Sequence, residues 1–288
     1  DNYSLLNESL NQHNGFYFQI ENGFDDDGFW HEGSIAYQNY TLNAMSISIE
    51  AAKYFGVNLA NYSWQTSSGK SIKLSKPFTS HLNLVKPDGT FPRLNDDIRG
   101  LDLASVLPLL EFTNSYWPNT IPSHIMNKAR EVNQEYSIKL LLWSKPLNNN
   151  SEQIGSVNYE MFGVSIIRHN DTYVLIDYGS HGGWHGHYDK LNVEITLNDS
   201  NLFLDPGTVE YSLPSSSEWY RNSFAHSIPF IDNRNQPETT GKMMNYDFSS
   251  NMSFVIAQYT DDIVKTNVTR LVLVLSTPQY GDIVFDAS

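Results

Sequence analysis

The spacing of apolar residues changes once along the chain, and this change limits the folds that the chain can adopt. From about residue 32 to residue 143, apolar side chains recur at the intervals of a helix with one buried face. After an Asn-, Ser- and Gly-rich segment at residues 147–156, short apolar runs and alternating patterns typical of strands follow. We therefore expect a multidomain α and β protein, with a helical domain at residues 1–146 and an antiparallel β-sandwich at residues 155–288.

The first half contains one long apolar stripe and shorter helical segments. The stripe predicts a helix that ends before Gly56, and its members are Ile35, Gln38, Leu42, Met45, Ile49 and Ala52. Residues 105–112 and 125–143 predict further helices, with Pro118 and Pro122 between them.

The second half consists of short strand-like runs. Residues 162–168 and 173–178 are apolar runs joined by Asn170-Asp171, a dipeptide typical of a hairpin turn. In residues 191–197 apolar and polar side chains alternate, which predicts a strand with one buried face. Further strands are predicted at residues 254–258, 271–275 and 283–285.

The composition excludes several classes of function. The chain has 18 Lys and Arg against 32 Asp and Glu, a net charge of -14, and no basic run that could neutralise phosphates. We therefore expect no nucleic-acid partner. The absence of cysteine excludes disulfides and thiol chemistry. No apolar stretch approaches the roughly 18 residues that span a bilayer, so we expect no membrane span.

Acceptor motifs for N-linked glycans are frequent. Nine Asn-X-Ser/Thr motifs occur, at Asn2, Asn7, Asn39, Asn61, Asn149, Asn170, Asn198, Asn251 and Asn267. Because Asn39 lies inside a predicted helix, where acceptors are poor, we expect glycans at the other eight positions. The excess favours an extracellular glycoprotein, either secreted or at the cell surface.

The motif His185-Gly186-His187-Tyr188-Asp189-Lys190 carries the chemistry. On a strand, His185, His187 and Asp189 would point to one face, where one imidazole could bind a metal while the other transfers protons. Asp205 and His226 each lie beside an apolar run and could complete a set of two histidines and one aspartate around a divalent cation. An exposed polar strand face is the alternative.

Several motifs in order along the chain resemble one enzyme family. These motifs are Asp27-Gly28-Phe29-Trp30-His31-Glu32-Gly33-Ser34, His185-Gly186-His187-Tyr188-Asp189-Lys190-Leu191-Asn192, Asp205-Pro206-Gly207-Thr208, Trp219-Tyr220-Arg221 and Ala225-His226-Ser227. They resemble the heparinase II/III-like and oligo-alginate lyase family of polysaccharide lyases.

The resemblance implies a partial (α/α) toroid at residues 1–146, followed by the β-sandwich, with the active site between them. It also implies further helix pairs before residue 1 and further strands after Ser288. The implied reaction is β-elimination on an acidic polysaccharide or oligosaccharide that contains uronic acid. A donor neutralises the carboxylate at C5, a Tyr or His removes the neighbouring proton, and the 4-linked oxygen leaves with a proton.

The resemblance also assigns residues to roles. Implied catalytic residues are His185, Gln38, Asn39 and Tyr220. Implied substrate-binding residues are Arg221, His31, Glu32 and Trp184. The implied metal ligands are His187, Asp205 and His226, which would hold a structural zinc ion. For some of these residues a structural alternative exists: Gln38 as a hydrogen-bonded core residue, Glu32 as an acid favoured by the helix dipole, and Tyr220 with Arg221 as a surface loop.

One position departs from the family pattern. The family has a proton-transferring tyrosine in the region of residues 88–97, where this chain has Phe91, which cannot transfer a proton. Available substitutes are Tyr37, Tyr40, Tyr116 and Tyr220.

Taken with the motifs, the leading hypothesis is a secreted polysaccharide lyase. The alternatives are a non-catalytic extracellular protein that binds glycans or assembles at a surface, and a metal-dependent hydrolase.

Overall fold

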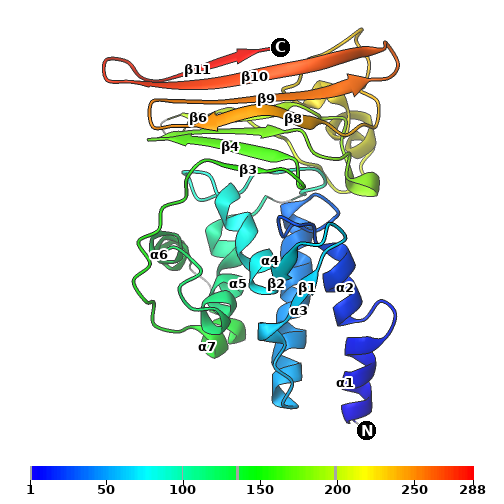
Figure 1. Ribbon diagram of the computed structural model, residues 1–288, viewed down its shortest axis with the longest axis vertical. Helices are drawn as coiled ribbons and strands as arrows, with labels where there is room; N and C mark the ends of the chain where they lie inside the picture. The colour runs from blue at the N-terminus through cyan, green and yellow to red at the C-terminus, as the bar shows by residue number, and fades with distance from the viewer. Residues whose placement is uncertain (1, 99, 134–135, 198–199) are drawn as a thin grey trace. The chain divides into compact units, whose positions relative to one another are not determined.

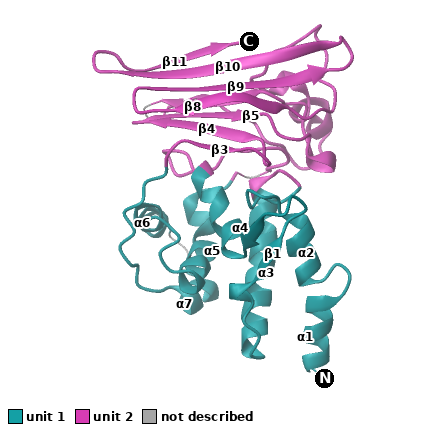
Figure 2. Cartoon of the chain, viewed as in Figure 1, with its two compact units in different colours: residues 1–31, 36–83, 101–154 teal, residues 32–35, 84–100, 155–288 magenta. Residues whose placement is uncertain are grey.

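The chain divides into two compact units in a computed structural model that describes residues 2–98, 100–133, 136–197 and 200–288. The first unit, called the helical unit, comprises residues 1–31, 36–83 and 101–154 (Figure 2). The second, called the two-sheet unit, comprises residues 32–35, 84–100 and 155–288. An N-terminal helical region followed by antiparallel sheets confirms the predicted mixed α and β class. The predicted domain boundaries stay a prediction.

The helical unit contains the α-helices and one small hairpin (Figure 1). The helices are α1 (Asn2–Asn11), α2 (Phe16–Gly23), α3 (Ile35–Tyr54), α4 (Ser75–Ser80), α5 (Leu103–Tyr116), α6 (Ser123–Val132) and α7 (Ile138–Trp143), and the hairpin is β1 (Ser63–Gln65) with β2 (Ser71–Lys73). These seven helices of the described residues are too few to establish a toroid. None of them is long and apolar enough to cross a membrane.

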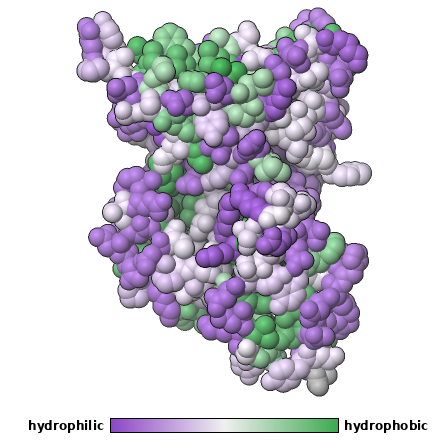
Figure 3. Space-filling model, viewed as in Figure 1, coloured by the Kyte–Doolittle hydropathy of each residue, from purple (hydrophilic) through white to green (hydrophobic). Residues whose placement is uncertain are grey.

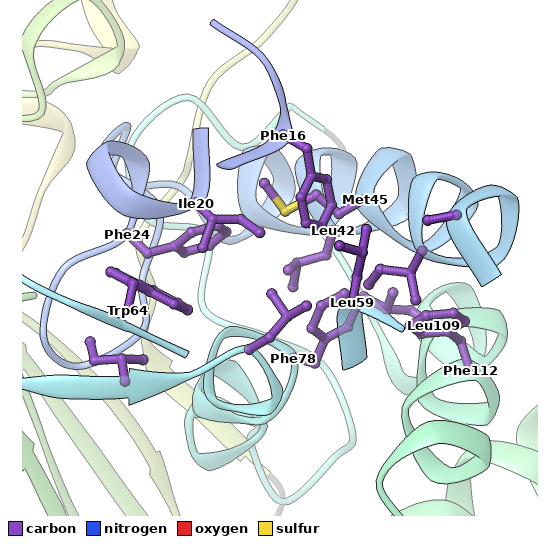
Figure 4. Packing of buried hydrophobic residues seen from close by; sticks show 14 of the residues in the cluster. Phe16, Ile20, Phe24, Leu42, Met45, Leu59, Trp64, Phe78, Leu109 and Phe112 are labelled. Carbon is purple, nitrogen blue, oxygen red and sulfur yellow. The ribbon is translucent and has the colours of Figure 1, made fainter. Parts of the chain in front are cut away.

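The predicted apolar stripe forms part of the helical core. In α3, Leu42, Met45, Ile49 and Ala52 are all buried in one cluster with residues of α2, α4 and α5 (Figure 4). Gly56 follows the helix with a φ of 81°, a left-handed conformation that glycine adopts without strain.

Predicted helices in the second part of this unit differ in their bounds. The prediction at residues 105–112 corresponds to α5, which extends by a turn and begins with a capping box at Asp102 and Ser105. The prediction at residues 125–143 corresponds to two separate helices, α6 and α7. α6 ends at Val132 and α7 begins after Ser137, whose side chain caps it.

Two antiparallel sheets share one core in the two-sheet unit. The five-stranded sheet has the order β3 (Val157–Tyr159), β4 (Val164–His169), β5 (Thr172–Asp177), β6 (Asn192–Leu197), β7 (Ser200–Phe203). The four-stranded sheet has the order β11 (Gly281–Ala287), β10 (Thr266–Thr277), β9 (Met252–Asp261), β8 (Lys242–Phe248). Val174 and Val193 of the first sheet and Val255 and Val272 of the second belong to one buried cluster, so the sheets pack face to face.

Part of the outer face of the four-stranded sheet is apolar. Leu273 of β10 pairs with Phe254 of β9 and Phe285 of β11, and these side chains point away from the shared core. Phe285 is 50% exposed. Figure 3 shows hydrophobic side chains at the surface over this sheet.

Strand β6 differs from its prediction because both of its faces are buried. Its polar residues Asn192, Glu194 and Thr196 are at most 1% exposed, whereas the alternating pattern predicted one buried face. The segment of residues 84–98, called the strap, contacts the polar face: the Lys86 ammonium lies 3.6 Å from the Glu194 carboxylate. Asn192 instead donates to Asp205 and Thr196 to Asn201, so each polar side chain has a partner that a sequence pattern cannot show.

The strap is also bonded to strands β4 and β5. The Tyr173 hydroxyl donates to the Leu84 carbonyl over 3.1 Å, and the Arg168 guanidinium donates to the Val85 carbonyl. The strap is therefore fixed to the five-stranded sheet by side chains from three neighbouring strands, β4, β5 and β6.

The backbone packs closely around Gly163, just before β4, and a substitution there tests this packing. Its φ is 79°, and an added Cβ would lie 1.9 Å from the Gly179 Cα. We expect Gly163→Ala to lower the free energy of unfolding by about 2–5 kcal/mol, the sum of left-handed strain and overpacking. The matched control is Gly281→Ala, at a φ of 71° with no atom within 4 Å of the added Cβ. Equal losses in urea unfolding of the two variants would contradict the close packing.

Glu194 should make stability depend on pH. Burial raises the pKa of Glu194 from 4.5 to about 8, although Lys86 opposes the shift. Because the folded protein holds this proton more tightly than the unfolded chain, the stabilisation is present below about pH 4.5 and is lost as the pH rises through about 8. In metal-free protein, Glu194→Gln should flatten the fall in unfolding free energy between pH 5 and 8. The exposed Glu160→Gln is the control, and parallel curves for Glu194→Gln and wild type would contradict the expectation.

Candidate active site and metal centre

The histidine motif lies on a glycine-rich loop, so the prediction that it occupies a strand is wrong. A short 3-10 helix, Gly183–His185, precedes an irregular segment that leads to β6. Gly182 and Gly183 have φ values of 84° and 64°. A Cβ at Gly186 would lie 1.6 Å from the His181 carbonyl oxygen, so only glycine fits this turn.

Both imidazoles of the motif nevertheless reach one carboxylate. His185 Nδ1 lies 3.0 Å from Asp96 Oδ2, and His187 Nε2 lies 3.0 Å from Asp96 Oδ1. Asp96 belongs to the strap and its side chain is fully buried. Burial would raise the pKa of Asp96, but the hydrogen bonds from His187 and His185 hold it below its usual value. Asp96 is therefore an ionised acceptor for both rings.

His187, Asp205 and His226 come together as predicted. Each offers a ligand atom, and these atoms lie within 4.8 Å of one another. Asp205 Oδ1 accepts a bond of 2.8 Å from the Gly207 backbone, and Oδ2 accepts one of 2.7 Å from Asn192. These bonds orient the carboxylate, and the group as a whole could hold a metal ion.

The hydrogen bonding of His187 fits a metal. Because the Asp96 carboxylate accepts from Nε2, the neutral His187 ring carries its proton there and has a lone pair at Nδ1. Nδ1 is buried and has no hydrogen-bond partner among the residues that the structure describes. A buried imidazole nitrogen of this kind is a typical metal-ligand atom.

Without a metal, His226 and Asp205 share a proton. His226 Nδ1 lies 3.2 Å from Asp205 Oδ2, and both side chains are fully buried. Burial would lower the pKa of His226, but the Asp205 and Asp189 carboxylates raise it to about 9. A cation bound here would replace that proton.

Asp189 belongs to a buried ion cluster with one lysine and a second aspartate. Its Oδ1 lies 2.9 Å from Lys190 Nζ, which also lies 2.8 Å from Asp177 Oδ2. All three side chains are almost completely buried. The Asp189 carboxylate therefore shares the Lys190 ammonium with Asp177.

Glu32 and Tyr211 complete the surroundings of His185. His185 Nε2 lies 3.2 Å from Glu32 Oε1, so the structure brings the predicted substrate-binding acid to the predicted catalytic histidine. The Tyr211 hydroxyl lies 3.2 Å from His185 Nδ1 and donates to Asp96 Oδ2 over 3.0 Å. His185 is 24% exposed and Tyr211 is 53% exposed, so both can meet a substrate.

The sequence reasoning missed Tyr211 and gave Asp96 no role. Tyr211 follows the turn Asp205-Pro206-Gly207 and was not among the tyrosines considered as substitutes for Phe91. Tyr211 lies far from the histidine motif in the sequence, so the sequence gave no reason to select it. Phe91 is 1% exposed and belongs to the interior.

Arg221 holds the histidine loop in place. Its guanidinium donates to the Gly186 carbonyl over 3.0 and 3.2 Å and to the Trp184 carbonyl over 2.8 Å. The Trp184 side chain is 92% exposed, and Tyr220 is half-buried at the end of the π-helix Ser216–Tyr220. The predicted grip of Arg221 on a sugar carboxylate stays a prediction.

The remaining predicted site residues belong to the helical unit. The Gln38 amide is buried and makes three bonds to backbone, to Trp30 over 3.3 Å, Gly28 over 3.2 Å and Pro77 over 3.0 Å. This geometry favours the structural alternative for Gln38. Asn39 accepts from the Asn43 amide, and the exposed His31 ring packs on Trp30.

Comparisons with known proteins agree with the predicted family. Residues 155–249 match the sequence model of the family Heparinase II/III-like, C-terminal, which confirms the family for this part of the chain. No curated protein matches the sequence. The fold of heparinase III, the BT4657 gene product, matches with a TM-score of 0.68 at 17% identity, over 98% of this chain and 40% of that one.

A second solved structure gives the same result. The heparan sulfate lyase HepC from Pedobacter heparinus matches with a TM-score of 0.66 at 15% identity, over 94% of this chain and 40% of that one. Identities this low show a shared fold alone. The chain spans about two fifths of the length of these structures.

Substitution of the residues that could bind the metal tests the metal centre. We expect His187→Ala and Asp205→Ala to lose bound metal in elemental analysis and to become insensitive to EDTA. A chelator should lower the unfolding free energy of the wild type by about 3 kcal/mol if the metal is present at 100 times its Kd.

The control for this experiment is His169→Ala. His169 is a buried histidine whose Nε2 lies 2.7 Å from the Ser253 hydroxyl, so its loss should lower stability and leave the metal content unchanged. Unchanged metal content in His187→Ala and Asp205→Ala would refute the site.

Proposed function

We propose that the protein is a secreted polysaccharide lyase that cleaves a uronic-acid-containing polysaccharide by β-elimination. The observation that supports this most strongly is the arrangement around His185. A partly exposed imidazole and an exposed phenol, that of Tyr211, lie 3.2 Å apart against one buried carboxylate. The histidine loop also lies within residues 155–249, which match the heparinase II/III-like family.

His185 and Tyr211 are the proposed proton-transfer pair. One of them removes the proton at C5, whose electrons form the C4–C5 double bond as the C4–O4 bond breaks, and the other protonates the leaving oxygen. Tyr211 then supplies the phenol that the chain lacks at Phe91. Glu32 lies 3.2 Å from the second nitrogen of His185 and orients the ring from that side.

Zinc is the proposed metal, held by His187, Asp205 and His226. Two imidazoles and a carboxylate are a donor set that zinc prefers. The side chains of all three are buried, so the ion's chemistry is structural: it fixes the loop from which His185 projects. Burial also argues against a metal-dependent hydrolase, which needs an open coordination position.

The proposal extends to the fold and the location of the protein. The helices would form a portion of an (α/α) toroid and the two sheets a β-sandwich, as in complete lyases of the family. Glycosylation would accompany secretion, and Asn2, Asn7, Asn61, Asn149, Asn170, Asn251 and Asn267 are all exposed. Asn198 lies outside the described residues.

A non-catalytic glycan-binding or surface-assembly glycoprotein is the second candidate. Two observations favour it. Phe91 is buried where the family has a tyrosine, and the Gln38 amide already donates its hydrogen bonds to the Gly28 and Pro77 carbonyls. Such a protein would keep the metal centre and the fold and would bind an acidic polysaccharide without cleaving it.

An assay for the unsaturated product tests the lyase. Wild type incubated with alginate, heparan-type and ulvan-type polymers should generate the absorbance of the C4–C5 double bond. His185→Ala and Tyr211→Phe should each lower the rate at least about 100-fold, as expected for loss of a general acid or base. Their melting temperatures should stay close to that of the wild type.

Tyr280→Phe serves as the control, because Tyr280 is also an exposed tyrosine of the two-sheet unit, at 70% exposure. Its rate should equal that of the wild type. No absorbance on any polymer at several pH values, with metal bound and the fold intact, would contradict the lyase. Binding of a polymer without new absorbance would support the glycan-binding protein.

A further inference from the structure

We propose that Asp96 is a positioning residue that joins the metal ligand His187 to the proton-transfer group His185, so that metal binding fixes the orientation of the His185 ring. This inference rests on the proposed function for the roles of the metal and of His185. Asp96 contacts neither a metal ligand atom nor the position of a substrate directly, and acts through the two imidazoles.

The two oxygens of Asp96 divide their contacts between the two parts of the site. Oδ1 accepts from His187 Nε2 over 3.0 Å. Oδ2 accepts from His185 Nδ1 over 3.0 Å and from the Tyr211 hydroxyl over 3.0 Å. An ionised carboxylate can only accept, so these three groups must donate to it.

The protonation of both rings follows from these bonds. His187 keeps its proton at Nε2 and presents Nδ1, the buried nitrogen without a hydrogen bond among the described residues, as the ligand atom. His185 donates from Nδ1 to Asp96, and its Nε2 lies 3.2 Å from the Glu32 carboxylate. Asp96 therefore determines which nitrogen of His187 can bind a metal, and it holds the Nδ1–H of His185.

The backbone around Asp96 is held by its neighbour Asn95. The Asn95 side-chain oxygen accepts from the His187 backbone over 3.2 Å, and its amide nitrogen donates to the Gly33 carbonyl over 3.0 Å. Gly33 follows Glu32 in the chain, so Asn95 connects the segments that carry Glu32 and His187. This places the carboxylate of the next residue between the rings.

Coupling through Asp96 works in both directions. His187 would hold the ion through Nδ1, and the charge withdrawn from its ring would strengthen the bond from Nε2–H to Asp96 and so order His185. By linkage, loss of the carboxylate must weaken the metal site and loosen His185 together. A merely structural role of Asp96 would lower stability without these two effects.

The variant Asp96→Asn tests the coupling with zinc as the added ion. We expect its zinc affinity, measured by competition with a chelator, to fall about 10- to 100-fold, the usual effect of removing a carboxylate behind a ligating histidine. In nitrogen NMR of labelled histidines at one fixed pH, the His185 Nδ1 signal should shift, because its N–H loses the carboxylate that accepts from it.

Asp261→Asn is the matched control. Asp261 is a buried aspartate of the same unit that pairs with Arg234 over 2.6 Å. Its replacement should lower the melting temperature and leave both zinc affinity and the His185 signals unchanged. A zinc affinity of Asp96→Asn within twofold of the wild type, or unchanged His185 nitrogen signals, would overturn the inference.

A measurement on the wild type covers the case in which Asp96→Asn does not fold. The His185 nitrogen signals should change when zinc is added and return when EDTA removes it, and signals that ignore zinc would overturn the inference. None of these readouts needs turnover. If zinc affinity and the His185 signals change together in a protein without lyase activity, the inference holds and the proposed function fails. If the His185 signals stay unaltered in an active lyase, the inference fails and the proposed function holds.

Discussion

The structure of the two-sheet unit depends on the pairing of buried polar groups across the outer face of its five-stranded sheet. Burying a polar group without a partner costs free energy, so each side chain of this face has to meet a complementary group. Asn192 donates to Asp205, and Glu194 lies beside Lys86 of the strap. These pairs fix the strap and the Asp205 turn to one strand, β6, and so position the carboxylates on which the candidate site is built.

Apolar spacing predicted part of the fold: the stripe of α3, helix α5, and the strands β4, β5, β6, β9, β10 and β11. It gave no prediction for β3, β7 or β8. β6 shows the limit of this reasoning: alternation revealed its two faces and could not show that the polar one is buried as well. Only the chain that covers a strand decides that, and the strap lies about a hundred residues earlier in the sequence.

The candidate site could be predicted in part. His187, Asp205 and His226 were selected from residue types and from the resemblance, and the structure brings them together. Asp96 and Tyr211 were not selected, because both lie in loops, where no spacing indicates which way a side chain points. The loop of the histidine motif was expected to be a strand because alternate histidines suit one, yet its glycines determine its conformation.

The full burial of Asp96 has a consequence for which ions the centre can accept. Asp205 and Asp96 are buried carboxylates, and Lys190 is shared between Asp189 and Asp177, so negative charge is in excess here. A multiply charged cation offsets more of this excess than a singly charged one does. The attraction for the cation is shared between a carboxylate that would touch the ion and one that lies an imidazole's width away.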